Sequence, residues 1–162
     1  MKTLLILRHA KSSWKHPELS DHDRPLNKRG KHDAPIMGRQ LKEKRLVPDL
    51  IISSTAVRAK DTALVIADVV WYTKEIVFLS SLYAASPDAY IQAISHVAGD
   101  NDYSTILVVG HNPGLEELIE VLTGDMHELS TCALAIIEMP TDKWSTLNRR
   151  QGKLIDGIRT KH

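Results

Sequence analysis

The sequence predicts an α/β fold, a three-layer α/β/α sandwich around a mainly parallel β-sheet. Short runs of apolar and β-branched residues alternate along the chain with longer segments in which apolar residues recur at helical spacing. Most of the short runs lack polar alternation, as do strands that helices cover on both faces. Strands and helices that alternate in this way typically form a parallel sheet between two layers of helices.

Five apolar runs are the predicted strands. Each contains four or five residues, and enough chain separates each run from the next to form a helix. They are Thr3–Leu7, Leu50–Ser53, Ile76–Leu79, Thr105–Val109 and Ala133–Ile137.

Four segments between these runs have the pattern of helices. Asn27 and Ser86 are candidate N-caps, Pro87 suits a first helical turn, and Gly99 suits the position after a last turn. The connection from Ala10 to Leu26 is long and has no regular pattern, and long loops in compact domains are often functional. The predicted helices are residues 27–45, 55–70, 86–99 and 112–124.

Composition limits the class of protein. The 162 residues suit one domain, residues 1–162, which can bury a core without a disulfide or a metal. Cys132 is the single cysteine, so no intramolecular disulfide and no multi-cysteine zinc site can form. The net charge of +1 gives no bias toward nucleic acid or a membrane surface, and the apolar run near Met1 is too short for a signal peptide or a bilayer span. We therefore expect a cytoplasmic protein without a nucleic-acid or membrane partner.

Basic side chains follow three of the predicted strands. Arg8 and His9 end the first, Arg58 lies a few residues after the second, and His111 follows the run that ends at Val109. Ligands of open α/β sheets bind beyond the carboxyl ends of the strands, so these four side chains are expected at one edge of the sheet. An exposed strand end with a salt bridge is the alternative for Arg8 and His9, but the whole set favours an anion site.

These residue types suit phosphoryl transfer. Two guanidiniums can hold a phosphoryl group by paired hydrogen bonds and stay charged at any working pH. One neutral imidazole can attack phosphorus, and a second can donate a hydrogen bond as charge develops on the oxygens. Backbone N–H groups of the helices after Ser54 and Asn112 would add donors.

Four segments, in chain order LRHAKSSW, DRPLNKRG, SSTAVRAKDTA and VVGHNPGLEEL, carry a resemblance to a known family. They resemble the histidine phosphatase superfamily, whose fold is phosphoglycerate-mutase-like, and within it they are similar to the SixA-type phosphohistidine phosphatases. The resemblance runs from Thr3 to about Gly124, which is most of the chain.

The resemblance implies a role for each matching residue. His9 would be the nucleophile that becomes transiently phosphorylated. Arg8, Arg58 and His111 would bind and stabilise the phosphoryl group, and Ser12 matches a position that can contact phosphate. The resemblance implies no cofactor and no metal ligand.

Nearby side chains allow more than one interpretation. Asn112 is a candidate for binding substrate, but we favour a role as the N-cap of the helix that follows it. Asp21, Asp23 and Arg24 are expected to pin the long loop by local hydrogen bonds, although one of the two acids could reach the site.

No general acid can be assigned from the sequence. Many mutases and acid phosphatases of the superfamily have a Glu or Asp soon after the third strand, whereas the segment FLSSLYAASPD has no acid before Asp88. A phosphorylated imidazole is a good leaving group, so this departure favours a phosphohistidine substrate over an alkyl phosphate.

The sequence thus predicts a metal-independent phosphatase that acts on a phosphohistidine-containing protein. A phosphatase of a small phosphorylated metabolite or a phosphoglycerate-type mutase is the first alternative, against which stands the lack of extra chain for a lid that excludes water. A non-catalytic phosphate-binding module is the second, against which stands the complete set of Arg8, His9, Arg58 and His111.

Overall fold

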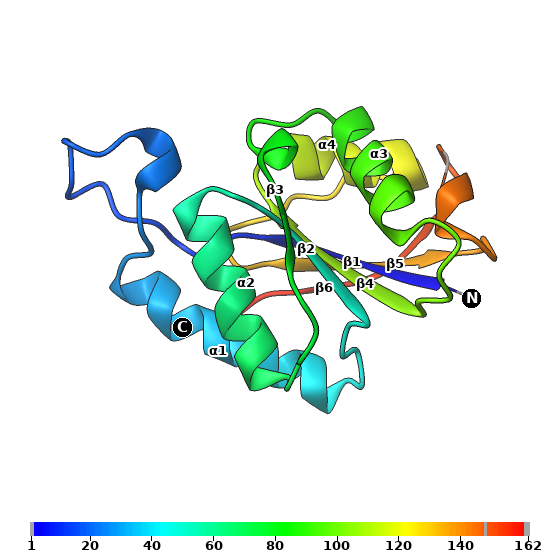
Figure 1. Cartoon of the computed structure of the whole chain (residues 1–162), viewed down its shortest axis with the longest axis horizontal. Helices are drawn as coiled ribbons and strands as arrows, with labels where there is room; N and C mark the ends of the chain where they lie inside the picture. Colours follow the sequence, from blue (N-terminus) through cyan, green and yellow to red (C-terminus); the bar gives the residue numbers. More distant parts are fainter. Residues whose placement is uncertain (1, 148, 161–162) are drawn as a thin grey trace.

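A six-stranded sheet lies at the centre of the computed structural model, which describes residues 2–147 and 149–160 (Figure 1). The strand order is β3-β2-β4-β1-β5-β6. The pairs β3–β2, β2–β4 and β4–β1 are parallel, and β5 runs antiparallel to both of its neighbours. The predicted α/β fold with a mainly parallel sheet is confirmed. The strands are β1 (Lys2–Arg8), β2 (Leu50–Ser54), β3 (Val77–Leu79), β4 (Thr105–Gly110), β5 (Leu134–Met139) and β6 (Lys153–Ile158).

Strand β6 was absent from the sequence prediction. It forms an edge of the sheet, and its side chains are mostly exposed or half-buried, with Ile158 the buried one. An edge strand that is solvated in this way has no continuous apolar run, so its sequence reads as a connection.

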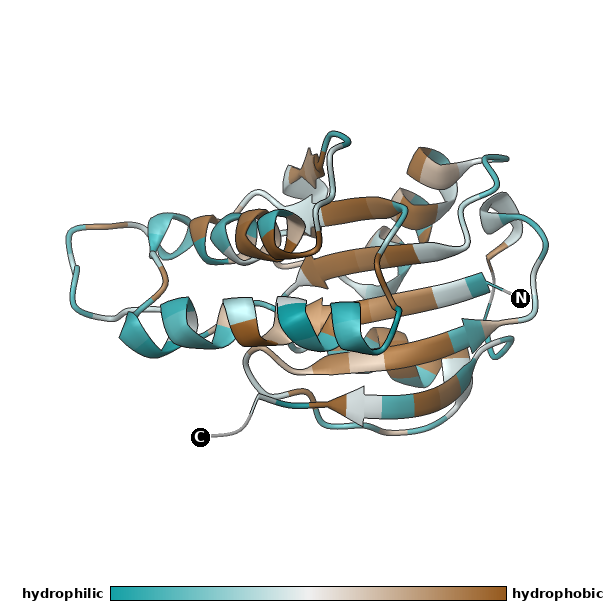
Figure 2. Ribbon diagram, turned by 90° about the horizontal axis from the view of Figure 1, so that it is seen from below, coloured by the Kyte–Doolittle hydropathy of each residue, from teal (hydrophilic) through white to brown (hydrophobic). Residues whose placement is uncertain are grey.

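Two layers of helices cover the sheet (Figures 1 and 2). Alternate β1 residues point to opposite faces, so Leu4 and Ile6 join the core beneath α3 and α4, whereas Leu5 and Leu7 join the core beneath α1 and α2. The helices are α1 (Lys28–Glu43), α2 (Val57–Val69), α3 (Pro87–Ala98) and α4 (Gly114–Thr123), with short 3-10 helices at Asp21–Asp23 (η1), Ser80–Leu82 (η2) and Trp144–Thr146 (η3).

The starts of α1 and α3 and the end of α3 follow the predicted signals. The Asn27 side chain accepts a hydrogen bond from the Gly30 backbone at 2.9 Å, and Ser86 accepts one from Ala89 at 3.4 Å. Gly99 ends α3 with φ of 55°, a conformation that favours glycine. The predicted caps at Asn27 and Ser86 are therefore confirmed.

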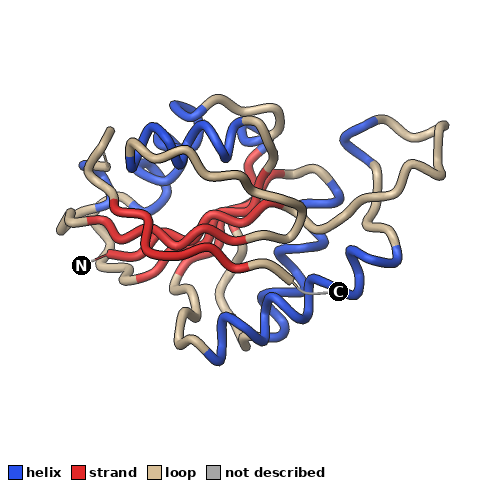
Figure 3. The backbone as a smooth tube through the Cα atoms, turned by 180° about the vertical axis from the view of Figure 1, so that it is seen from behind, coloured by secondary structure: helices blue, strands red, loops and turns tan. Residues whose placement is uncertain are grey.

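The long loop from Ala10 to Leu26 projects beyond the carboxyl ends of the parallel strands (Figures 1 and 3). Its two arms are paired, because Ser12 forms an antiparallel bridge with Leu26. A Cβ atom at Gly30 would lie 2.2 Å from the backbone oxygen of Lys11, so glycine lets the start of α1 pack directly against this loop. The loop thus packs beside the end of β1.

Candidate active site

The predicted residues gather around one cavity of about 410 Å³ at the carboxyl edge of the sheet. The sheet register explains this convergence, since Arg8 of β1 is paired with Gly110 of β4, and Ser53 of β2 with Val109. The cavity is lined by Arg8, His9, Lys11, Ser12, Trp14, Arg24, Arg58, His111, Asn112 and Thr131. All six residues predicted for catalysis or substrate binding are therefore in its wall.

The His9 ring is held in one tautomer. Its Nδ1 lies 2.7 Å from the backbone oxygen of Ala10, and because a carbonyl can only accept, Nδ1 carries the proton. Burial, together with the positive groups of Arg58 and Arg8 and the nearby His111, lowers the pKa of His9 to about 3. The neutral ring therefore has an unprotonated Nε2, which is the form required of a nucleophile.

Backbone contacts fix the position of His9. The Ala10 amide donates to Thr62 Oγ1 at 3.0 Å, and the Thr62 hydroxyl donates to the Arg58 backbone oxygen at 2.7 Å. From the opposite side, the Cys132 amide lies 3.1 Å and 3.0 Å from the backbone oxygens of Arg8 and His9. The end of β1 is thus tied both to α2 and to the segment before β5.

The His111 ring faces that of His9, with 5.2 Å between the ring centroids. His111 Nε2 lies 2.8 Å from Ser54 Oγ, which also accepts a hydrogen bond from the Ala56 amide at 3.2 Å. This arrangement favours a Ser54 hydroxyl that donates to Nε2, which leaves the ring proton on Nδ1. Burial is the main cause that lowers the pKa of His111 to about 4, so a neutral ring can offer its Nδ1–H to an anion.

Tyr90 supports the backbone at His111. Its hydroxyl accepts a hydrogen bond from the His111 amide at 3.2 Å. A Cβ atom at Gly110 would lie 2.3 Å from this hydroxyl, and one at Gly114 would lie 3.1 Å from the same ring and 2.2 Å from the Ala85 backbone oxygen. Both glycines of the VGHNPG segment are thus required by close packing.

Arg58 is held by the long loop. Its Nη1 donates to the Asp21 backbone oxygen at 2.6 Å, and its Nη2 donates to Asp21 Oδ2 at 3.0 Å. Asp21 also accepts hydrogen bonds from Tyr83 and Arg24. The predicted local hydrogen bonds of the loop are present between Arg24 and Asp21 and between His22 and Asp23. Of the two acids, Asp21 reaches the site through its contacts with Arg58.

Three buried donors in the cavity wall lack a protein acceptor among the described residues. They are Arg8 Nε, Arg58 Nε and His111 Nδ1. Buried donors without partners are costly, and most such groups in proteins are satisfied by water or a ligand. A tetrahedral oxyanion offers several acceptor oxygens to one small space, so it matches this set of donors.

Ser12 and Asn112 both contact other protein groups. Ser12 Oγ accepts a hydrogen bond from Arg24 Nη1 at 2.9 Å. Asn112 Nδ2 donates to Glu116 Oε2 at 3.1 Å and to the Leu129 backbone oxygen at 2.7 Å. The favoured interpretation of Asn112 as an N-cap is wrong, because Pro113 occupies the N-cap position of α4 and the Asn112 amide donates rather than accepts. That Ser12 and Asn112 bind substrate remains a prediction.

The carboxylates near the cavity are engaged as acceptors. Asp21 has two hydrogen-bond donors on Oδ2, and these contacts lower its pKa to about 2. Glu116 Oε2 accepts from Asn112 and from the Leu129 amide, and Asp88 pairs with Arg149.

Sequence reasoning missed three supporting side chains. Ser54 is the last residue of β2, at the same edge as the predicted basic residues, so the strand-end rule that found Arg58 could have found it. Tyr83 directly follows η2, and Tyr90 lies within α3. Neither carries a strand-end signal, because both reach the site only through packing of the folded chain.

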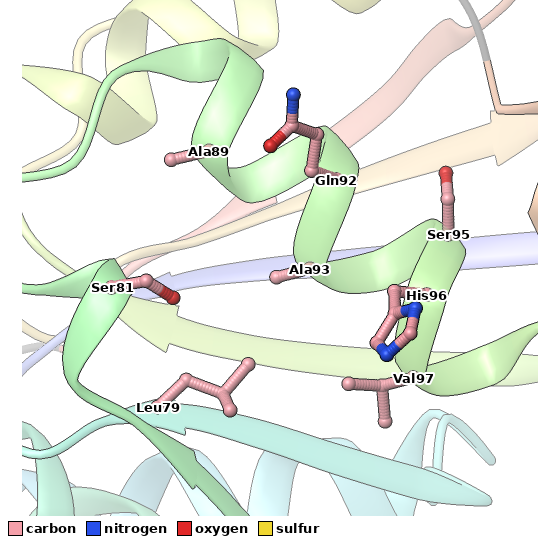
Figure 4. Close-up of a pocket in the computed structure, with 8 residues that line it drawn as sticks. All are labelled: Leu79, Ser81, Ala89, Gln92, Ala93, Ser95, His96 and Val97. Atoms are coloured by element: carbon pink, nitrogen blue, oxygen red, sulfur yellow. The ribbon is translucent and has the colours of Figure 1, made fainter.

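A second hollow, of about 660 Å³, lies between the end of β3 and α3 (Figure 4). Its wall is made largely of apolar and small side chains, and none of the predicted site residues lines it. The smaller, basic cavity, which the predicted residues line, is therefore the candidate active site.

Within residues 2–147 and 149–160, no three or more His, Cys, Asp or Glu side chains come together as a possible metal site. In the same part of the chain, no helix has both the length and the apolar character needed to cross a membrane.

The free energy of unfolding is expected to rise with pH between about pH 4 and 6.5. The pKa values of about 3 for His9 and about 4 for His111 lie below the value of about 6.5 for histidine in an unfolded chain. In this range the unfolded chain binds protons that the folded protein does not, so acid favours unfolding. Urea unfolding at a series of pH values measures the slope. A His111→Gln variant should show a smaller slope, and an unchanged slope would contradict the assignment.

The fold and the basic site together point to a class of phosphatases. The family description "Histidine phosphatase superfamily (branch 1)" matches residues 4–77. An uncharacterised chloroplastic protein of Arabidopsis thaliana is 35% identical over 150 residues, which are 88% of this chain and 69% of that protein. The chain belongs to the histidine phosphatase superfamily.

Within the superfamily, the chain is of the SixA type. SixA from Agrobacterium tumefaciens, which is assigned as a phosphohistidine phosphatase, has a TM-score of 0.82 and 28% identity, with 98% of each chain covered. The protein histidine phosphatase SixA complexed with tungstate has a TM-score of 0.83 and 19% identity, with 96% of each chain covered. A mycobacterial glucosyl-3-phosphoglycerate phosphatase shares the fold, with a TM-score of 0.75 and 14% identity over 96% of this chain and 97% of that one.

Proposed function

We propose that the protein is a phosphohistidine phosphatase that works through a covalent phosphohistidine on His9 and acts on a histidine-phosphorylated protein. The observation that carries the proposal is the His9 ring, whose proton is fixed on Nδ1 by the Ala10 backbone oxygen at 2.7 Å. Its free Nε2 lies in a cavity whose wall also contains Arg8, Arg58 and His111.

In the first step, the Nε2 lone pair of His9 attacks phosphorus. The bond between phosphorus and the substrate nitrogen breaks, and the imidazole, whose second ring nitrogen is protonated in the substrate, keeps the electron pair and leaves as a neutral ring. Arg8 and Arg58 bind the phosphoryl oxygens, and the Nδ1–H of His111 donates to them as charge develops in the transition state. The product of this step is phosphorylated His9 and a dephosphorylated histidine on the substrate.

In the second step, water attacks the phosphorus of phosphorylated His9. The bond from phosphorus to Nε2 breaks, the ring recovers its lone pair, and inorganic phosphate leaves with the proton balance made up by solvent. The same arginine and His111 donors stabilise this transition state, because it carries charge on the same oxygens.

Among the described residues, no aspartate or glutamate lines the cavity, which supports an imidazole leaving group. An alkoxide leaving group needs a proton during bond cleavage, whereas an imidazole already protonated on its second nitrogen leaves readily as a neutral ring. Trp14 and Lys11, on the loop at the cavity wall, are both exposed and available to a protein partner.

The preference for a protein substrate is expected to be large. Contacts outside the phosphoryl group can lower the barrier, so kcat/KM should be higher for a histidine-phosphorylated transfer domain than for small phosphate esters, by about 10²-fold or more. The assay compares such a domain with 3-phosphoglycerate and a sugar phosphate under one set of conditions. Faster processing of either small ester would exclude the phosphohistidine proposal while leaving His9 as the nucleophile.

A phosphatase of small phosphate esters, or a phosphoglycerate-type mutase, is the second candidate, since the fold is shared with a phosphatase of a small molecule. A mutase would return the phosphoryl group to an acceptor, so inorganic phosphate would not accumulate. A non-catalytic phosphate-binding module would bind phosphate without turnover. The release of inorganic phosphate in the assay described above distinguishes both of these candidates from a phosphatase.

We further propose that the reaction needs no metal ion, because His9 supplies the nucleophile and the arginines supply the positive charge. Activity should be unchanged in excess EDTA. Loss of activity that zinc or magnesium restores would replace this mechanism with metal-assisted hydrolysis.

A further inference from the structure

Asp21 bonds directly to two guanidiniums of the candidate site. Its Oδ2 accepts hydrogen bonds from Arg58 Nη2 at 3.0 Å and from the Tyr83 hydroxyl at 2.5 Å. Its Oδ1 accepts from Arg24 Nε at 3.1 Å, and its backbone oxygen accepts from Arg58 Nη1 at 2.6 Å. A single residue of the long loop thus connects two arginines and a tyrosine from three separate segments of the chain.

These contacts fix how the Arg58 guanidinium is turned. Asp21 takes the edge formed by Nη1 and Nη2, and the remaining edge carries Nε, which is buried without an acceptor in the described structure. The Arg58 side chain is only 7% exposed, whereas that of Asp21 is 49% exposed. The half-exposed acid therefore fixes the orientation of a buried arginine that lines the cavity.

A carboxylate beside an anion site also has a cost. Its negative charge repels a phosphoryl dianion, and this repulsion must be offset by some other effect. The acid has no role as a proton donor, because the Tyr83, Arg58 and Arg24 contacts lower its pKa to about 2 and it stays ionised. Orientation of Arg58 is the effect that the contacts support.

We propose that Asp21 is a positioning residue, which holds the Arg58 guanidinium in the orientation that binds the phosphoryl group. The proposal rests on the phosphatase function proposed above, but it also applies to the binding of any tetrahedral oxyanion. Tyr83 assists, because its hydroxyl fixes the Asp21 carboxylate, and its ring packs edge-on against His111 with 5.6 Å between centroids.

The test uses Asp21→Asn and Asp21→Ala, with Tyr83→Phe as a milder change and Asp23→Asn as the control. Asp23 lies on the same 3-10 helix, and its side chain contacts His22 rather than an arginine. Calorimetry measures the affinity of each variant for inorganic phosphate and for orthovanadate, which can adopt the five-coordinate geometry of the transition state. Turnover of a histidine-phosphorylated domain gives kcat and KM, and thermal unfolding checks the fold.

Positioning predicts weaker binding in spite of the lost negative charge. For Asp21→Ala, kcat/KM should fall about 10-fold to 100-fold, mainly in kcat, since an interaction made in the transition state is lost. Vanadate affinity should fall more than phosphate affinity, Asp21→Asn and Tyr83→Phe should show smaller losses, and Asp23→Asn should behave as wild type.

Two other results would overturn the proposal. Tighter binding of both anions in Asp21→Asn would show that the acid acts only by repulsion. A lower melting temperature with unchanged anion affinities and an unchanged KM would show that it only stabilises the loop. Failure of the wild-type protein to hydrolyse phosphohistidine would reject the proposed function, whereas the phosphate and vanadate affinities would still decide the role of Asp21.

Discussion

Replacement of His9 by alanine is expected to abolish turnover, with a loss of at least about 10⁴-fold in kcat. The reason is chemical. The Ala10 backbone oxygen holds the His9 proton on Nδ1, so Nε2 of this cavity-lining ring stays unprotonated and can attack phosphorus. The Cys132 amide donates to the backbone oxygen of His9, and the Ala10 amide donates to Thr62 Oγ1. Neither contact involves the His9 ring. The variant should therefore fold.

Two measurements check the His9 prediction. Steady-state turnover gives the loss in rate, and brief incubation with a phosphoryl-labelled substrate followed by an alkaline quench, which preserves phosphohistidine, detects the covalent intermediate. Label should be bound by wild type and by the control His16→Ala, which changes an exposed histidine of the same loop. Wild-type rates or retained label in His9→Ala would show that another residue is the nucleophile.

Replacement of Arg58 by alanine should lower kcat/KM by about 10² to 10³-fold, the range seen when one charged or polar donor to a developing oxyanion is removed. The loss has two parts. The phosphoryl group loses a guanidinium, and Asp21 keeps its negative charge beside the cavity without its partner at 3.0 Å. Both KM and kcat should therefore change.

Arg58→Lys and Arg39→Ala are the matched comparisons. Lysine keeps the positive charge but lacks the planar fork, so it should restore only part of the lost activity. Arg39 is an exposed arginine of α1, and its removal should leave the kinetics unchanged. Unchanged kinetics in a folded Arg58→Ala variant would exclude Arg58 from the site.

The basic part of the site could be predicted from the sequence because it follows from the geometry of a parallel sheet. Residues that follow parallel strands emerge at the same edge of the sheet. Pairing of Arg8 with Gly110 therefore brings the rings of His9 and His111 together, with 5.2 Å between their centroids. The prediction needed only the order of the strands and the residue types at their ends.

The supporting part could not be predicted, because it depends on contacts between distant loops. Tyr83 and Asp21 are 62 positions apart, and neither lies in a periodic segment that would show which way its side chain points. Asn112 was misread for a related reason. Its sequence position suits a cap, but its side-chain amide donates to the backbone oxygen of Leu129 and to the carboxylate of Glu116. Only the folded chain brings Leu129 close to Asn112.

The backbone of Cys132, which holds the peptide oxygens of Arg8 and His9, has a consequence for the tolerance of the protein to oxidants. Burial raises the pKa of the Cys132 thiol to about 12, so the thiolate that reacts with peroxide or with alkylating reagents is scarcely formed. The proposed nucleophile, His9, is an imidazole, which peroxide does not inactivate by the sulfenic acid route. A phosphatase built in this way can keep working under oxidative stress that silences enzymes with a cysteine nucleophile.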